Sequence, residues 1–166
     1  EVDVYPIRTP AIDVISVGAG GGSVAWLAPG DRLKVGPRSA GADPGPACYG
    51  RGGLDVTITD ANFYLGRLPE QLAGGTVHLD RAKAEAALAA LGERVGLSPL
   101  DLASGIIQIG EMNMADAIRQ VSVQKGRDPR LFRLVASGGA GPLHACALAE
   151  ILSIPEVIIP PVPGIG

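Results

Sequence analysis

The sequence predicts an α/β fold in which helices flank a mixed sheet. Three observations support this class: a β-hairpin pattern in the first third, helical periodicity in the middle, and a strand–turn–helix–strand pattern at the end. The 166 residues suffice for one domain. We expect three consecutive parts, namely residues 1–66 with a hairpin and a long loop, residues 67–126 with helices, and residues 127–166 with the last pattern.

Residues 12–36 have the composition of β structure. A β-branched run at 12–17 predicts a strand, which ends at a glycine-rich turn. A hairpin follows, with its bend at Pro29-Gly30-Asp31. Alternation predicts that Val24 and Trp26 share one face, with Leu33 as a further candidate for it.

Residues 36–53 show no periodicity and contain six glycines and three prolines. This composition predicts a long loop rather than a helix or strand. Long ordered loops in compact domains are usually functional, so we expect this loop to border a binding site.

Two helices are predicted in the middle of the chain. Asp80 can cap the first, whose apolar residues recur at helical spacing: Ala84, Ala87, Leu88 and Leu91. Ser98 and Pro99 start the second, which continues to Gly126 over roughly 40 Å. Apolar residues surround much of the second helix, so it is either buried on several sides or covered by a partner.

The last third predicts a βαβ unit. A strand at 134–137 leads into a glycine turn, Pro142 opens a helix, and a second strand begins near Val157. Such a crossover joins two parallel strands.

Composition argues against several classes of protein. The net charge of −3 and the pI near 5.3 disfavour nucleic acid as a partner. No apolar run approaches the ~20 residues that a membrane helix needs, and the first residues do not resemble a signal peptide. Cys48 and Cys146 lack metal-ligand spacing, so we expect two free thiols and a cytoplasmic protein.

The glycine run before the hairpin is the first candidate ligand site. Gly20, Gly21, Gly22 and Ser23 can present a row of backbone N–H groups, and such rows bind phosphate oxygens. The run is neither a Walker A loop nor a dinucleotide-binding fingerprint, because no Gly-Lys-Ser/Thr follows and β structure rather than a helix comes next. The alternative is an ordinary glycine-rich β-turn.

A second candidate lies in the βαβ unit. Gly138, Gly139, Ala140 and Gly141 connect a strand to a helix, where N–H groups and the helix dipole favour anions or polar ring atoms. An ordinary strand–helix turn is the alternative. The two turns together, with a long loop between them, predict a nucleotide cleft.

Four segments carry a resemblance to a known family: IDVISVGAGGGSVAWL, VGPRSAGADPGPACYGRGG, VTITDANFYLGRLP and LVASGGAGPLHACALAE. In this order the chain resembles the hydantoinase A / 5-oxoprolinase family, which includes ATP-binding subunits of acetone- and acetophenone-type carboxylases. The resemblance implies an actin/Hsp70-like (ribonuclease H-like) ATPase fold. Gly20 to Ser23 would then be the second phosphate-binding turn, and Gly138 to Gly141 the adenosine-side turn.

The resemblance also implies a reaction. Members use ATP with Mg²⁺ to phosphorylate an amide or carbonyl oxygen, and cyclic amides such as hydantoin or 5-oxoproline are then hydrolysed. Carboxylase members instead carboxylate the activated compound. We therefore expect ATP, Mg²⁺ and a cyclic amide as ligands, with a carboxylase subunit or a non-catalytic interaction fragment as the alternatives.

Two departures from the family pattern matter. The family's N-terminal phosphate motif and its C-terminal continuation are not in this sequence, so we expect an inactive fragment that needs the rest of the enzyme, a separate subunit or an oligomer. Gly18 stands where Hsp70-like relatives carry an aspartate, so we expect no metal ligand from this turn.

Several polar side chains remain open to two interpretations. Asp43, Asp60 and His144 are candidate catalytic residues; Asp43 can instead cap its own turn, Asp60 can be a helix N-cap, and His144 can be a packed core histidine. Arg38 and Arg51 flank the long loop and can pair with phosphate or carboxylate, or lie on the surface. Cys48 is a substrate-side candidate by position alone, and His78 carries no functional expectation.

Overall fold

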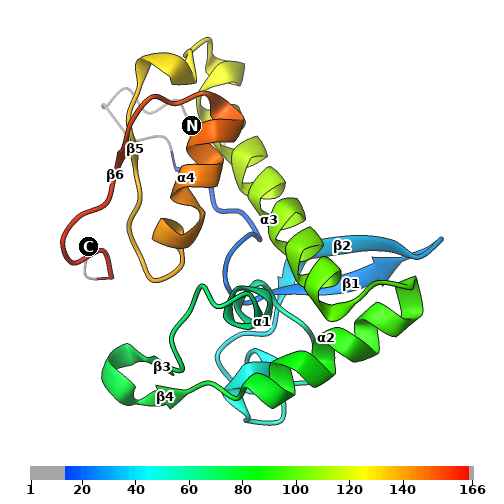
Figure 1. Ribbon diagram of the computed structural model, residues 1–166. Helices are drawn as coiled ribbons and strands as arrows, with labels where there is room; N and C mark the ends of the chain where they lie inside the picture. The colour runs from blue at the N-terminus through cyan, green and yellow to red at the C-terminus, as the bar shows by residue number, and fades with distance from the viewer. Residues whose placement is uncertain (1–13, 165–166) are drawn as a thin grey trace, which may run out of the picture.

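The computed structural model describes residues 14–164. Its longest element, helix α3 (Pro99–Val121), runs through the molecule as a spine (Figure 1). The hairpin and helices α1 (Ile58–Tyr64) and α2 (Arg81–Val95) surround its N-terminal half, and helix α4 (Gly141–Leu152) packs beside its C-terminal half. The α/β class is therefore confirmed.

The hairpin consists of strands β1 (Ser23–Ala28) and β2 (Arg32–Ser39), paired antiparallel. Its register places Leu33 opposite Leu27, on the face that packs Ala25 and Val35 into the core, while Trp26 pairs with Lys34. The expected sharing of a face by Leu33 and Trp26 is thus wrong. The pairing is regular from Ala25 to Ala28, so the register that the bend sets places Leu33 on the face of the odd-numbered residues of β1 and Trp26 on the other face.

The strand predicted at 12–17 does not form over its described part. Residues 14–17 are irregular and exposed, and Val14 keeps 80% of its surface accessible. A β-branched sequence forms a strand only beside a partner, and no described strand pairs with these residues.

Both predicted helix starts are confirmed. The Asp80 side chain accepts from the Lys83 amide at 3.1 Å, and the Ser98 side chain accepts from the Asp101 amide at 3.1 Å. Helix α3 stops at Val121, earlier than expected, and a 3-10 turn (Val123–Lys125) leads to Gly126 in the left-handed conformation. Helices α1, α2 and α4 and strand β2 all contact α3 and bury apolar residues on several of its sides, whereas Leu100 and Met112 stay exposed.

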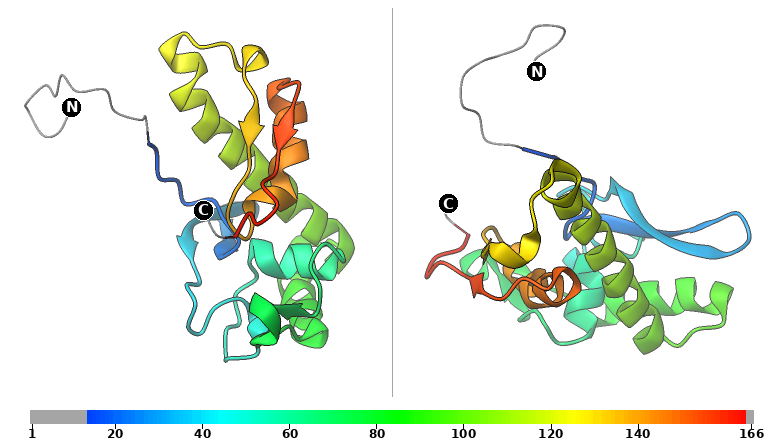
Figure 2. Two further views of the ribbon diagram at one scale, coloured as in Figure 1. Left: turned by 90° about the vertical axis from the view of Figure 1, so that its left-hand side faces the viewer. Right: turned by 90° about the horizontal axis from the view of Figure 1, so that it is seen from above.

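The end of the chain is a βαβ unit, as predicted. Strands β5 (Leu134–Val135) and β6 (Val157–Ile158) are parallel, and α4 lies between them and α3 (Figure 2). Leu134 of β5 and Val157 of β6 pack in one apolar cluster with Leu148 and Leu152 of α4. Val135 and Ile158 lie on the opposite, exposed face of the strand pair.

A single mixed sheet is not formed by the described residues. They form three separate two-stranded sheets, of which the third pairs β3 (Gln71–Leu72) with β4 (Val77–His78), joined by a 3-10 turn (Ala73–Gly75). Short 3-10 turns also occur at Ala47–Tyr49 and Pro129–Leu131.

No helix in the part of the chain described is both long and apolar enough to cross a bilayer.

Candidate functional site

The first glycine turn is held rigidly by its carbonyl groups. The Gly20 oxygen accepts from the Ser23 amide, the Gly21 oxygen from the Thr59 amide and hydroxyl, and the Gly22 oxygen from the Ala40 amide, all at 2.8–2.9 Å. The Ser23 hydroxyl also accepts from the Gly20 amide at 2.9 Å. Within residues 14–164 no acceptor is found for the Gly21 and Gly22 amides, so these two N–H groups can serve an anion.

The second glycine turn leads into α4. Gly138 has φ of +83°, a conformation that side chains disfavour, and Gly141 is the first helical residue, with Pro142 next. No acceptor within the described residues takes the Gly139, Ala140 or Gly141 amide. The positive end of the α4 dipole therefore coincides with three available N–H groups.

The structure brings the two turns together although they are more than 110 residues apart in the sequence. A Cβ placed on Gly21 would lie 3.9 Å from the Ala140 Cβ. By contrast, a Cβ on Gly20, Gly139 or Gly141 would meet no atom within 4 Å. The two rows of amides thus lie close to each other, with open space over Gly20, Gly139 and Gly141.

The Asp60 carboxylate does not border this space. Thr57, not Asp60, is the N-cap of α1, and Asp60 is the third helical residue of a capping box, so the predicted N-cap role is wrong by three positions. The carboxylate is fully buried and accepts from the Thr57 amide and hydroxyl and from the Ala47 and Cys48 amides, at 2.7–3.3 Å. These contacts attach the long loop to α1.

His144 is fully buried between three helices, in the first turn of α4. Its Nδ1 lies 3.1 Å from Glu111 Oε1 on α3, and its Nε2 lies 3.3 Å from Asn62 Nδ2 on α1. Glu111 Oε1 is also 3.7 Å from Arg67 Nη1. The histidine therefore contacts neighbouring helices instead of the open space beside the turns.

The remaining candidates lie on or near the long loop. Asp43 is exposed, and Arg38 forms an exposed ion pair with Asp55 at 3.0 Å. Arg51 stacks over the Tyr49 ring at 5.9 Å. Burial, followed by the nearby Asp60 charge, raises the pKa of the Cys48 thiol far above its ordinary range, so this cysteine is a poor nucleophile.

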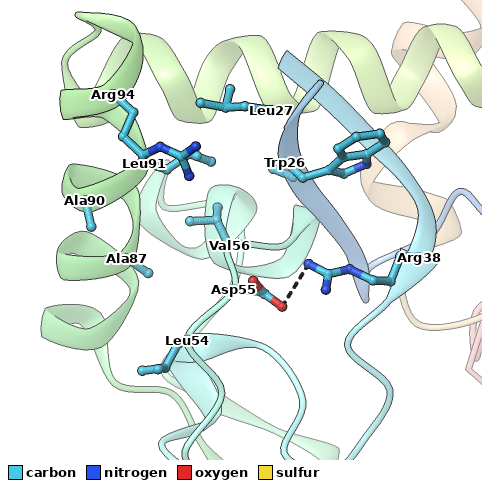
Figure 3. A pocket seen from close by; sticks show the side chains of 11 residues that line it. Trp26, Leu27, Arg38, Leu54, Asp55, Val56, Ala87, Ala90, Leu91 and Arg94 are labelled. Carbon is cyan, nitrogen blue, oxygen red and sulfur yellow. Dashed lines mark hydrogen bonds and ion pairs between the residues drawn. The ribbon is translucent and has the colours of Figure 1, made fainter. Parts of the chain in front are cut away.

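A cavity of about 390 Å³ offers a rival site between β1, the 54–56 segment and α2. Figure 3 shows the Arg38–Asp55 pair on the side opposite α2, with Leu91 and Arg94 on the helix. Neither glycine turn contributes a residue to it, and its only ion pair is already satisfied within the chain. We therefore place the candidate site at the turns.

The described residues contain no group of three or more His, Cys, Asp or Glu side chains arranged to hold a metal ion. The two turns themselves carry no carboxylate. Their contribution to a ligand is consequently made by backbone N–H groups and by the helix dipole.

Three residues that shape the site were missed in the sequence. Thr59 docks the first turn, and Asn62 and Glu111 hold His144. The capping-box spacing of Thr57 and Asp60 marks α1, and Glu111 falls at helical spacing between Ile107 and Ala115, which are both buried. An acidic residue on an apolar helix face signals a buried polar contact.

Comparison with known proteins adds to this geometry. Residues 1–166 match the sequence model of the family described as Hydantoinase/oxoprolinase. An uncharacterized protein of Methanocaldococcus jannaschii is 51% identical over 97% of this chain and 24% of its own length. The chain spans about a quarter or less of the relatives it matches.

Two solved structures are similar throughout. The ATP-dependent caprolactamase from Pseudomonas jessenii has a TM-score of 0.86 and 46% identity, covering 92% of this chain and 22% of that one. A nucleotide-free acetone carboxylase has a TM-score of 0.81 and 36% identity, covering 89% of this chain and 21% of that one.

Proposed function

The chain belongs to the hydantoinase/oxoprolinase family, and from that premise we propose that it is a nucleotide-binding part of an ATP-dependent cyclic-amide hydrolase. The observation that carries the proposal is the close approach of two glycine turns whose amides have no acceptor among the described residues. An actin/Hsp70-like ATPase arrangement, with residues 1–66 and 127–166 each supplying one turn, is part of the proposal. The two free thiols agree with a cytoplasmic setting.

In this proposal, Gly20 to Ser23 hold phosphates and Gly138 to Gly141 hold the adenosine side of ATP. Bound ATP supplies a phosphoryl group that activates the amide oxygen toward hydrolysis. The Gly21 and Gly22 amides stabilise negative charge on the phosphate oxygens, and their carbonyl contacts keep them aligned without reorganisation. Mg²⁺ would accompany the phosphates and take its protein ligands from outside the two turns, because these contain no carboxylate.

A carboxylase role is the second candidate. The similarity to acetone carboxylase favours it, since the same nucleotide site can activate a ketone oxygen. Assays of the complete enzyme with ATP and either 5-oxoproline, hydantoin and caprolactam or acetone and bicarbonate separate the two reactions.

The Gly139→Val substitution tests the nucleotide site in the complete enzyme. Its side chain enters space that the fold leaves open, so we expect a folded protein whose KM for ATP rises roughly tenfold or more, with a smaller change in kcat. Steady-state kinetics with varied ATP measures this change.

Ala90→Val is the matched control, because it adds a similar side chain to the rival cavity beside α2. We expect its KM for ATP to stay unchanged. A folded Gly139→Val enzyme with normal ATP kinetics contradicts the proposal, and a raised KM in Ala90→Val alone moves the nucleotide to the cavity beside α2.

A further inference from the structure

The buried residues Asn62, His144 and Glu111 form a hydrogen-bonded network, here called the His144 network. Its residues belong to the helices that adjoin the two glycine turns. The first turn rests on α1, because Gly21 accepts two hydrogen bonds from Thr59. One helical turn later, Asn62 of the same helix reaches His144, which stands in the first turn of α4. A short path of contacts therefore connects the phosphate side of the proposed site with the adenosine side.

The hydrogen-bond roles within the network follow from chemistry. A carboxylate oxygen accepts, so Nδ1–H of His144 donates to Glu111 Oε1. Nε2 is then left to accept from the Asn62 amide nitrogen. Both ring nitrogens are engaged, which fixes the orientation of the ring and with it the first turn of α4.

The network leaves one buried group unsatisfied. Asn62 Oδ1 is buried and has no hydrogen-bond partner among the described residues. An unpaired buried oxygen costs stability, so Asn62 satisfies only part of its amide by its contact with His144.

We infer that Asn62 and His144, with Glu111 as their support, are positioning residues that set the distance and angle between the two glycine turns. The inference rests on the proposed nucleotide site. A ligand that spans both turns gains affinity when they are held in the correct relative position, whereas a ligand in one turn gains nothing. ATP spans both turns, and adenosine occupies one.

The test compares binding of a non-hydrolysable ATP analogue and of adenosine by calorimetry in the complete protein. Asn62→Ala should weaken the ATP analogue about fivefold to tenfold and leave adenosine within about twofold. His144→Ala should behave alike, and the double variant should be no weaker than the weaker single variant, because both act through one contact. Asn62→Ser is made in parallel, so that a folded variant without the Asn62 amide is available if Asn62→Ala does not fold.

Asn113→Ala is the matched control. It removes a hydrogen bond of 3.0 Å from Asn113 on α3 to the Val35 oxygen, and the hydrogen bonds described for the two turns involve neither of these residues. Equal weakening of both ligands, or no weakening of either, overturns the positioning role while leaving the nucleotide site intact. A wild-type protein that binds neither ligand overturns the proposed function itself, and the positioning role with it.

Discussion

Among single residues, Asp60 explains why the long loop, which is rich in glycine and proline, adopts one ordered conformation. Its two oxygens accept hydrogen bonds from four donors of Ala47, Cys48 and Thr57, so this buried side chain is well satisfied. The Cys48 carbonyl in turn accepts from the Asp80 amide, which ties the same loop to the start of α2. The carboxylate thus organises the border of the site without touching it.

The two cysteines should differ sharply in reactivity. Cys48 is buried beside Asp60 and its raised pKa keeps the thiol protonated, whereas Cys146 is exposed. We expect iodoacetamide at pH 8 to label Cys146 alone in the folded chain, as mass spectrometry of peptides can show. Cys146→Ser should abolish labelling until denaturant is added, and rapid labelling of native Cys48 would contradict the buried environment.

The raised pKa of Cys48 also makes the stability of the fold depend on pH. The unfolded chain releases this proton near the ordinary value of 9.0, and the folded chain retains it. The free energy of unfolding should therefore fall as the pH rises above about 9, as urea titrations at pH 8 and 10 can measure. In Cys48→Ala this part of the pH dependence should be smaller, and an identical dependence in the variant would argue against it.

At the scale of elements, α1 and α3 approach closely because Gly110 has no side chain. A Cβ there would lie 2.7 Å from Ile58 Cδ1, whereas a Cβ on Gly105 of the same helix would meet only Leu33 at 3.9 Å. Gly110→Ala should lower the free energy of unfolding by ~1–3 kcal/mol through overpacking.

Gly105→Ala is the control and should instead raise the free energy of unfolding by up to ~1 kcal/mol, because alanine favours a helix. Chemical denaturation of the two variants decides the matter. Equal effects of both substitutions would show that α1 and α3 do not depend on this contact.

Elements with local signals could be predicted, and elements that depend on distant partners could not. Asp80 and Ser98 cap their helices through neighbours in the sequence, so both starts were predictable. The strand expected at 12–17 needed a partner strand. Both glycine turns could be named from composition, but their meeting at Gly21 and Ala140 depends on how α1, α3 and α4 pack, which no local pattern encodes.

For the whole molecule, the exposed face of the β5–β6 pair is the notable surface. Parallel strands are normally covered on both faces, yet Val135 and Ile158 remain 60% and 39% exposed, beside Leu131 and Phe132. The 166-residue chain alone should therefore bind a hydrophobic dye and self-associate.

Val135→Lys should reduce both effects, and Leu100→Lys, at an exposed position on α3, should not. Dye fluorescence and analytical ultracentrifugation measure the two effects. A monomeric wild-type chain that binds no dye would contradict this prediction.

The burial of helix α1 also has a consequence for the hydrogen exchange of its backbone amides. Seven residues are too few to form a stable helix alone, and Ile58 to Phe63 are all buried. Its amides can then exchange with solvent only when the surrounding layers separate, so they report global unfolding rather than local fraying. Thr59 of this helix contacts the first glycine turn, and Asn62 contacts His144 in the first turn of α4. A ligand bound at the two turns would therefore slow hydrogen exchange of the α1 amides, which it does not contact.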